Sequence, residues 1–104
     1  MEEGVGEECG IVGLFFKQKG KEKELPKILY EMLLQVQHRG QLSAGISVHK
    51  NFENGDGRIL SNFKDVGRVN DLFKIHDFKK SNEIFEYLSG NSGIGHVRYA
   101  TSGK

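Results

Sequence analysis

The chain has 104 residues, of which 15 are basic and 14 acidic, and its formal net charge is +1. This balance argues against a charge-driven grip on nucleic acid, which needs a clear basic excess. A single cysteine excludes a disulfide framework within the chain and a zinc site of the paired Cys-x-x-Cys kind. No apolar run approaches the roughly 20 residues that span a bilayer. Composition therefore predicts one small, soluble, cytoplasmic domain.

The first half of the chain is predicted to hold a strand, a helix and a second strand. Residues 11–16 form a continuous apolar run rich in branched and aromatic side chains, which predicts a strand buried on both faces. Residues 25–37 repeat apolar side chains at helical spacing, with Pro26 in the first turn and Gly40 just past the end. A charged loop separates the two, and residues 46–48 predict the second strand.

The second half is predicted to contain, in order, a hairpin turn at 54–57, a strand at 58–63, a short helix at 70–73 and a final strand at 94–99. Before that final strand, Ser81 is expected to cap the N-terminus of a further helix that Gly90 closes. Strands and helices that alternate in this way predict a layered mixed fold in one domain, with no internal repeat.

Cys9 stands directly before the first predicted strand. A lone cysteine in a soluble protein is usually a small buried hydrophobe. If the bond before Cys9 were cut, one residue would carry a thiol and an α-amine, whose reference pKa values are about 8.5 and about 7.7–8.0. Such an amine can accept the thiol proton near neutral pH, which makes Cys9 a candidate nucleophile for acyl transfer.

Two later segments carry residues suited to anion recognition. The run QHRGQLSAG at 37–45 is explained in part as a helix end and a polar turn, but its glycines and Arg39 also suit the presentation of backbone groups and a guanidinium to an anion. In GIGHVRYATSG at 93–103, Arg98 suits bidentate capture of a carboxylate. The alternative for Arg98 is a surface arginine that follows an edge strand.

The remaining titratable residues point to no further site. The histidines lack i,i+4 pairing or another recognised metal-ligand spacing, so no metal site is predicted at His38, His49, His76 or His96. The lysines of residues 17–23 and the Lys79-Lys80 pair are interpreted as solvated charge rather than as a nucleic-acid surface.

Taken in order, these motifs resemble the N-terminal glutaminase domain of the amidophosphoribosyltransferases, which are type 2, or N-terminal-nucleophile, glutamine amidotransferases. The resemblance rests on ECGIVG at 8–13, QHRGQLSAGI at 37–46, KDVGRVNDLF at 64–73 and GIGHVRYATSG at 93–103. It implies an α+β fold, the N-terminal-nucleophile hydrolase αββα sandwich of two antiparallel sheets between helix layers, incomplete in this chain. It also implies a propeptide-like leader at 1–8 and the front portion of the glutaminase domain at 9–104.

The resemblance implies a role for each matching residue. Cys9 would attack the glutamine side-chain amide, form a thioester and release ammonia, with its own α-amine as general base once the leader is removed. Arg98 would bind the glutamine α-carboxylate, and Thr101 would support the substrate nearby. Arg39 and Gly40 would line the pocket of the nucleophile.

The family as a whole would hydrolyse glutamine to glutamate and pass the ammonia to phosphoribosyl pyrophosphate, giving phosphoribosylamine in de novo purine biosynthesis. The family's oxyanion-hole Asn-Gly pair, which lies downstream of the Arg-Tyr motif, and its phosphoribosyltransferase domain are not in this sequence. No cofactor is therefore expected here, magnesium is expected only for the missing domain, and the full-length protein is expected to be a homo-oligomer. The 104-residue chain alone is predicted to be inactive and poorly stable as a monomer, with an exposed apolar face.

Other functions stay open at this point. The chain could be a truncated, inactive type 2 amidotransferase-like protein that acts, if at all, through a partner chain supplying the missing strands. It could also be a type 2 amidotransferase with another ammonia acceptor. A plain binding domain with an inert core cysteine is the third alternative.

Overall fold

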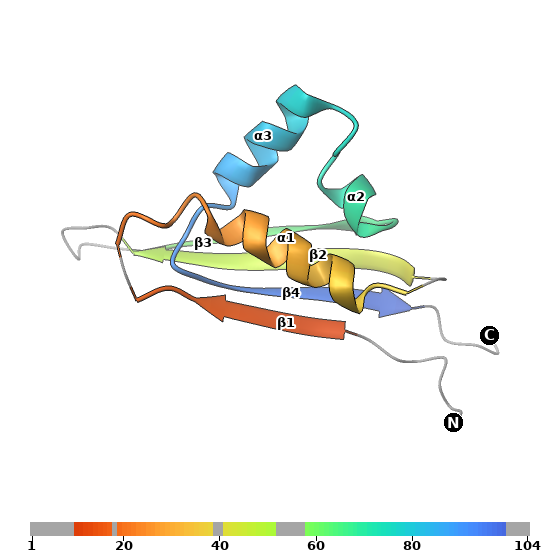
Figure 1. Cartoon of the computed structure of the whole chain (residues 1–104), viewed down its shortest axis with the longest axis horizontal. Helices are drawn as coiled ribbons and strands as arrows, with labels where there is room; N and C mark the ends of the chain where they lie inside the picture. Colours follow the sequence, from red (N-terminus) through yellow and green to blue (C-terminus); the bar gives the residue numbers. More distant parts are fainter. Residues whose placement is uncertain (1–9, 18, 39–40, 52–57, 100–104) are drawn as a thin grey trace.

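A computed structural model describes residues 10–17, 19–38, 41–51 and 58–99. In order along the chain these residues form β1 (Gly10–Phe15), α1 (Leu25–Val36), β2 (Gln41–Asn51), β3 (Arg58–Val66), α2 (Val69–Leu72), α3 (Phe78–Tyr87) and β4 (Ser92–Tyr99) (Figure 1). Every strand and helix predicted from the sequence has a counterpart among them, and β2 is considerably longer than its prediction. The order of elements is that of an α+β fold, as predicted.

The four strands form one antiparallel sheet in the order β1-β4-β2-β3. The last strand, β4, therefore lies inside the sheet between β1 and β2, and the interpretation of Arg98 as following an edge strand is wrong. β2 and β3 pair along their length, up to Asn51 opposite Arg58. The predicted turn at 54–57 lies outside the described residues.

Helix α1 packs across β1 and β4 on one face of the sheet (Figure 1). Pro26 lies in its first turn, where a backbone N–H would lack a partner within the helix. Leu25, Leu29 and Leu33 recur every fourth residue, so they share one face, and all three are fully buried. The predicted helix is confirmed, and it ends at Val36, one residue earlier than the prediction.

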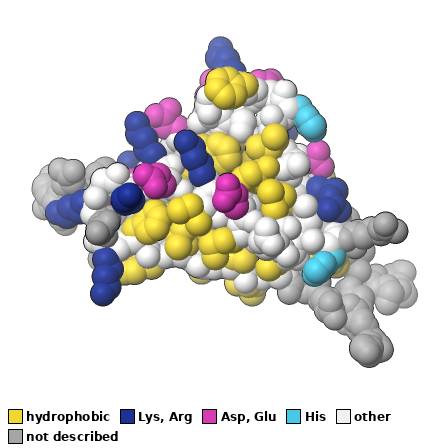
Figure 2. Space-filling view, in the orientation of Figure 1, with side chains coloured by type: hydrophobic (Ala, Val, Ile, Leu, Met, Phe, Trp, Pro, Cys, Tyr) yellow, Lys and Arg dark blue, Asp and Glu magenta, His cyan; other side chains and the backbone are white. Residues whose placement is uncertain are grey.

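Helices α2 and α3 complete the helical layer on the same side of the sheet (Figure 1). An aromatic cluster joins them to α1: the Tyr30 ring meets Phe73 edge-on at 5.2 Å, and Phe73 stacks on Phe85 at 5.0 Å. Figure 2 shows this helical side of the molecule, where charged side chains stand among apolar ones. The buried apolar core lies between the helices and the sheet, and consists of Leu25, Leu29, Leu33, Ala44, Ile46, Val48, Val69, Leu72, Phe73, Leu88 and Val97.

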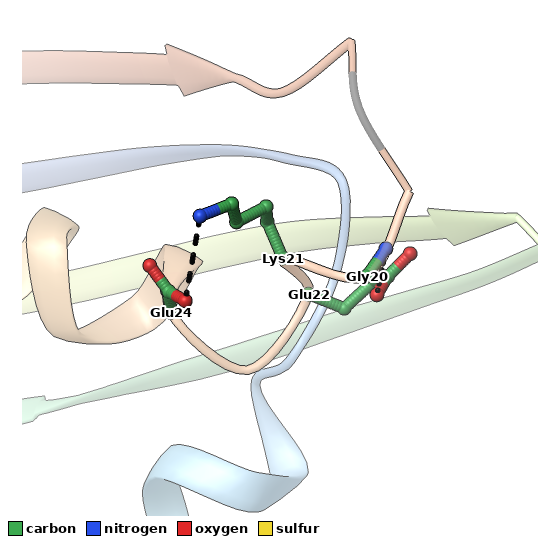
Figure 3. Close-up of polar contacts among 4 residues, drawn as sticks. All are labelled: Gly20, Lys21, Glu22 and Glu24. Carbon is green, nitrogen blue, oxygen red and sulfur yellow. Dashed lines mark hydrogen bonds and ion pairs between the residues drawn. The ribbon is translucent and has the colours of Figure 1, made fainter.

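The loop between β1 and α1 is held by short-range polar contacts (Figure 3). The Gly20 N–H donates to Glu22 Oε1 at 3.1 Å, and Lys21 Nζ lies 3.9 Å from Glu24 Oε2. Gly20 has a φ of +89°, which glycine adopts without the steric cost that a Cβ would bring. The Lys21 and Glu24 side chains are exposed, which agrees with the charged loop predicted here.

Two predictions about the strands and helices are corrected by the structure. β1 is not buried on both faces, because Ile11 and Phe15 are 74% and 65% exposed while the residues between them are half-buried or glycine. Ser81 is not the N-cap of α3. The first residue of the helix is Phe78, three residues before Ser81, and the Asp77 side chain caps it by accepting from the Lys80 N–H at 3.1 Å.

Gly90 does not close α3, which already ends at Tyr87. Instead, Gly90 is buried against β2, where a Cβ would lie 2.3 Å from Val48 Cγ1 and 2.7 Å from the His49 carbonyl oxygen. Its N–H donates to the carbonyl of Glu22 at 3.0 Å. Glycine is needed at this position because two backbone segments approach each other closely, not because a helix ends there.

Candidate functional site

Arg98 is the predicted site residue that the structure describes. The other predicted site residues lie outside the described residues: Cys9, Arg39, Gly40 and Thr101. The structure does, however, describe their sequence neighbours on three elements, which are β1, the end of α1 and β4.

Arg98 is the next-to-last residue of β4, and its side chain is exposed. Its neighbour Val97 is fully buried beneath the helices, so Arg98 points to the opposite face of the sheet. Val97 also pairs with Gly10 at the start of β1. The residue that directly follows Cys9 in the sequence is therefore paired with the residue that directly precedes Arg98.

The face on which Arg98 lies, here called the open face, is not covered by any described helix (Figure 1). Strand register places Arg98 opposite Ser43 on β2, and places His96 opposite Gly45. A Cβ on Gly45 would lie only 2.5 Å from His96 Nε2. The imidazole of His96 therefore extends over Gly45, in the row next to Arg98, and a larger residue at position 45 would displace it.

The open face is otherwise rich in large apolar side chains. Residues that are more than half exposed on it are Ile11, Phe15, Leu60, Val66 and Ile94. A shallow groove on this face is lined by Phe15, Leu60 and Ile94 and by the polar residues Ser47 and His49 of β2. An exposed apolar surface of this kind marks a place where another protein segment or a ligand packs. This exposed face agrees with the sequence prediction.

Tyr99 links Arg98 to the end of α1. The Tyr99 hydroxyl donates to the carbonyl of Val36 at 3.2 Å and accepts from the His38 N–H. The motif at 93–103 contains no local signal for this contact, which joins residues more than 60 positions apart.

The part of the chain that the structure describes contains neither a metal-binding cluster nor a helix that could span a membrane. No group of three or more His, Cys, Asp or Glu side chains there could hold a metal ion. None of the described helices is both long enough and apolar enough to cross a membrane.

Together these features define an α+β unit in which helices cover one face of a four-stranded antiparallel sheet and an exposed arginine stands on the other. No family model matches the chain, and no solved structure matches it.

Curated proteins do match. The amidophosphoribosyltransferases of Methanocaldococcus jannaschii, Bacillus subtilis and Homo sapiens are each 38% identical to this chain, over 95, 100 and 105 residues. The matches cover 91%, 96% and 97% of this chain but only 17%, 17% and 18% of those relatives. The chain therefore matches the N-terminal part of amidophosphoribosyltransferases.

Proposed function

We propose that this chain forms the front part of a glutaminase domain, which releases ammonia from glutamine within an amidophosphoribosyltransferase. The observation that carries the proposal is the position of Arg98, an exposed guanidinium on the strand that pairs with the residue following Cys9. The chain spans less than a fifth of the curated relatives that it matches, so the activity of the whole protein is part of the proposal.

Cys9 is the nucleophile in this proposal. After removal of residues 1–8, its α-amine takes the thiol proton, and the thiolate attacks the carbonyl carbon of the glutamine side-chain amide. The C–N bond then breaks, ammonia leaves with the proton returned by the amine, and a thioester remains. Water hydrolyses the thioester and yields glutamate, which regenerates the thiol.

Arg98 binds the α-carboxylate of glutamine in this mechanism. A planar guanidinium can donate two parallel hydrogen bonds to a carboxylate, and this fixes both the position and the orientation of the substrate. Among the described residues, none forms an ion pair with Arg98. Thr101 supports the substrate nearby, and Arg39 and Gly40 line the pocket of the nucleophile.

The proposal includes the N-terminal-nucleophile hydrolase fold. In that fold the sheet described here is one of two antiparallel sheets between helix layers, and the second sheet packs on the open face. The remainder of the protein supplies that second sheet, the oxyanion hole and the magnesium-dependent phosphoribosyltransferase domain. Ammonia is transferred there to phosphoribosyl pyrophosphate for purine biosynthesis, in a cytoplasmic homo-oligomer.

Covalent labelling with a glutamine analogue that carries an electrophile in place of the side-chain amide tests this function. The protein is expressed from the complete natural reading frame that contains these residues, whatever its length. We expect saturable labelling at Cys9 and a loss of about 10-fold to 100-fold in labelling efficiency for Arg98→Ala, because the charged hydrogen bonds to the carboxylate are removed. Lys64→Ala, which removes an exposed cation from the same face, is the matched control.

Two outcomes would count against the function. Labelling that is no faster than with the D-enantiomer of the analogue would exclude a glutamine site. An equal loss in Arg98→Ala and Lys64→Ala would reduce the effect of Arg98 to general surface charge.

A further inference from the structure

The two residues that leave α1, Gln37 and His38, are held by hydrogen bonds from distant parts of the chain. Gln37 has an extended backbone, with φ of −80° and ψ of 137°, so the helix stops there and the chain turns toward the sheet. Only residues 37–40 separate the end of α1 from the start of β2. Gln37 and His38 are the described residues of this connection, and they precede Arg39 and Gly40 in the sequence.

Gln37 contacts the start of α2 through its side chain. Its Oε1 accepts from the backbone N–H of Val69 at 2.9 Å, across 32 positions of sequence. Val69 is the first residue of α2, and an N–H in the first turn of a helix has no partner within that helix. The contact is partly buried, so loss of the Gln37 acceptor would leave a donor without a good alternative.

Arg68, the residue before Val69, contacts the same connection between α1 and β2. Its Nη1 donates to the carbonyl oxygen of His38 at 3.3 Å. Adjacent residues, Arg68 and Val69, thus hold adjacent residues, Gln37 and His38. The Tyr99 hydroxyl completes the arrangement by accepting from the His38 N–H.

The corner formed by residues 67–69 is itself firmly placed. Gly67 has a φ of +109° and turns the chain between β3 and α2. The Asp71 carboxylate accepts from the Arg68 N–H at 3.0 Å, while Val69 and Leu72 are fully buried in the core. The corner is therefore a fixed point against which the end of α1 is aligned.

We propose that Gln37 and Arg68 are positioning residues for the site, which act by fixing the chain that leads into Arg39 and Gly40. The inference rests on the proposed function, since it takes these two residues to line the pocket of Cys9. Neither Gln37 nor Arg68 is required to touch the substrate. Their effect is on how accurately the pocket is aligned with the substrate-binding end of β4.

Variants of Gln37 separate the hydrogen bond from simple space filling. Gln37→Met keeps the length of the side chain but replaces the amide oxygen with a thioether sulfur, which is only a weak acceptor, whereas Gln37→Glu keeps a strong acceptor for the Val69 N–H. Gln35→Met is the matched control, because Gln35 is exposed in the last turn of the same helix. All are made in the complete natural reading frame, together with Arg68→Met and Arg68→Lys.

Two readouts are compared: the rate at which Cys9 is labelled by the glutamine-analogue electrophile or by iodoacetamide, and hydrogen exchange of the Val69 and His38 amides. We expect Gln37→Met to slow labelling by the analogue about tenfold or more, since small misplacements near a reacting centre are costly. Iodoacetamide labelling should change little. In Gln37→Met, exchange at Val69 should become faster. Gln37→Glu should keep both readouts close to those of the unmodified protein. Arg68→Met should resemble Gln37→Met.

Each outcome decides the inference. It is overturned if exchange at Val69 is unchanged in Gln37→Met, because the hydrogen bond then does not hold the corner. It is also overturned if exchange changes but analogue labelling stays equal to that of Gln35→Met. If the unmodified protein is not labelled by the analogue at all, the proposed function fails, and the positioning role fails with it.

Discussion

Gly90 occupies a position at which no side chain fits. Its missing Cβ would meet Val48 Cγ1 at 2.3 Å and the carbonyl oxygen of His49 at 2.7 Å. A side-chain methyl can rotate away, but the carbonyl oxygen belongs to the backbone of β2 and cannot move without disturbing the sheet. This glycine therefore determines how closely the chain leaving α3 approaches the sheet.

Gly90→Ala is expected to lower the free energy of unfolding by about 1–3 kcal/mol, the usual cost of forcing extra volume into a packed site. Gly13→Ala is the matched control, because the nearest atom to a Cβ there is 3.8 Å away. That change should stay within about 0.5 kcal/mol of the original protein. Urea unfolding followed by circular dichroism measures both, and equal losses would show that the contact at Gly90 is not responsible.

Gly45 differs from Gly90 because its close neighbour is the end of a side chain. A Cβ at Gly45 would meet His96 Nε2 at 2.5 Å, and the imidazole can rotate away from it. Gly45→Ala should therefore displace the His96 ring and change its NMR signals. In a double-mutant cycle with His96→Ala, the two changes should couple by about 0.5–3 kcal/mol. Strict additivity would mean that His96 does not rest on Gly45.

Helix α3 illustrates how the ends of an element depend on a single side chain. Its N-cap is Asp77, which accepts from the Lys80 N–H at 3.1 Å. Asp77→Ala should lower the free energy of unfolding by about 1 kcal/mol, while Asp77→Asn should retain most of the stability. Ser81→Ala should cost less than Asp77→Ala, since Ser81 lies within the helix. Urea unfolding of the three variants distinguishes the two candidate caps.

The elements themselves were largely predictable, because each has a local signal. Apolar side chains at helical spacing predict α1, and the prediction for the short helix α2 differs from the structure by one residue at each end. The sequence does not predict the start of α3, because both Asp77 and Ser81 are good caps and only tertiary packing selects between them. The exposure of Ile11 and Phe15 was missed because a continuous apolar run does not reveal which face of a strand has a covering layer.

The candidate site was predictable only in part. The motif of β4 pointed to Arg98 because a guanidinium beside small residues suits a carboxylate, and the structure describes it as exposed on the open face. The contact between Gln37 and Val69 could not be foreseen, because it joins residues 32 positions apart through one side-chain oxygen. A sequence contains no local pattern for such a contact.

At the scale of the whole molecule, the open face should govern self-association of the 104-residue chain when it is produced on its own. Phe15, the last residue of the outer strand β1, and Ile94, on the inner strand β4, are 65% and 56% exposed on this face. Replacing both by lysine should reduce the fraction of oligomers measured by sedimentation velocity and the binding of a fluorescent hydrophobic dye, because charge then interrupts the apolar surface. Phe78→Lys is the control, since Phe78 is 80% exposed on α3. An equal reduction by the control would mean that the open face of the sheet is not the surface that mediates self-association.

The central position of β4 also has a consequence for the time course of folding. Among the described strands, β1 is the first to be synthesised, and its only partner there is β4, which is made some 80 residues later, as in the pairing of Gly10 with Val97. Pairing of such distant segments is slow, because the intervening chain must be ordered first. On the ribosome, the hairpin of β2 and β3 can form early, whereas β1 has to wait for the last strand. β1 is therefore left without this partner strand until synthesis has passed Tyr99.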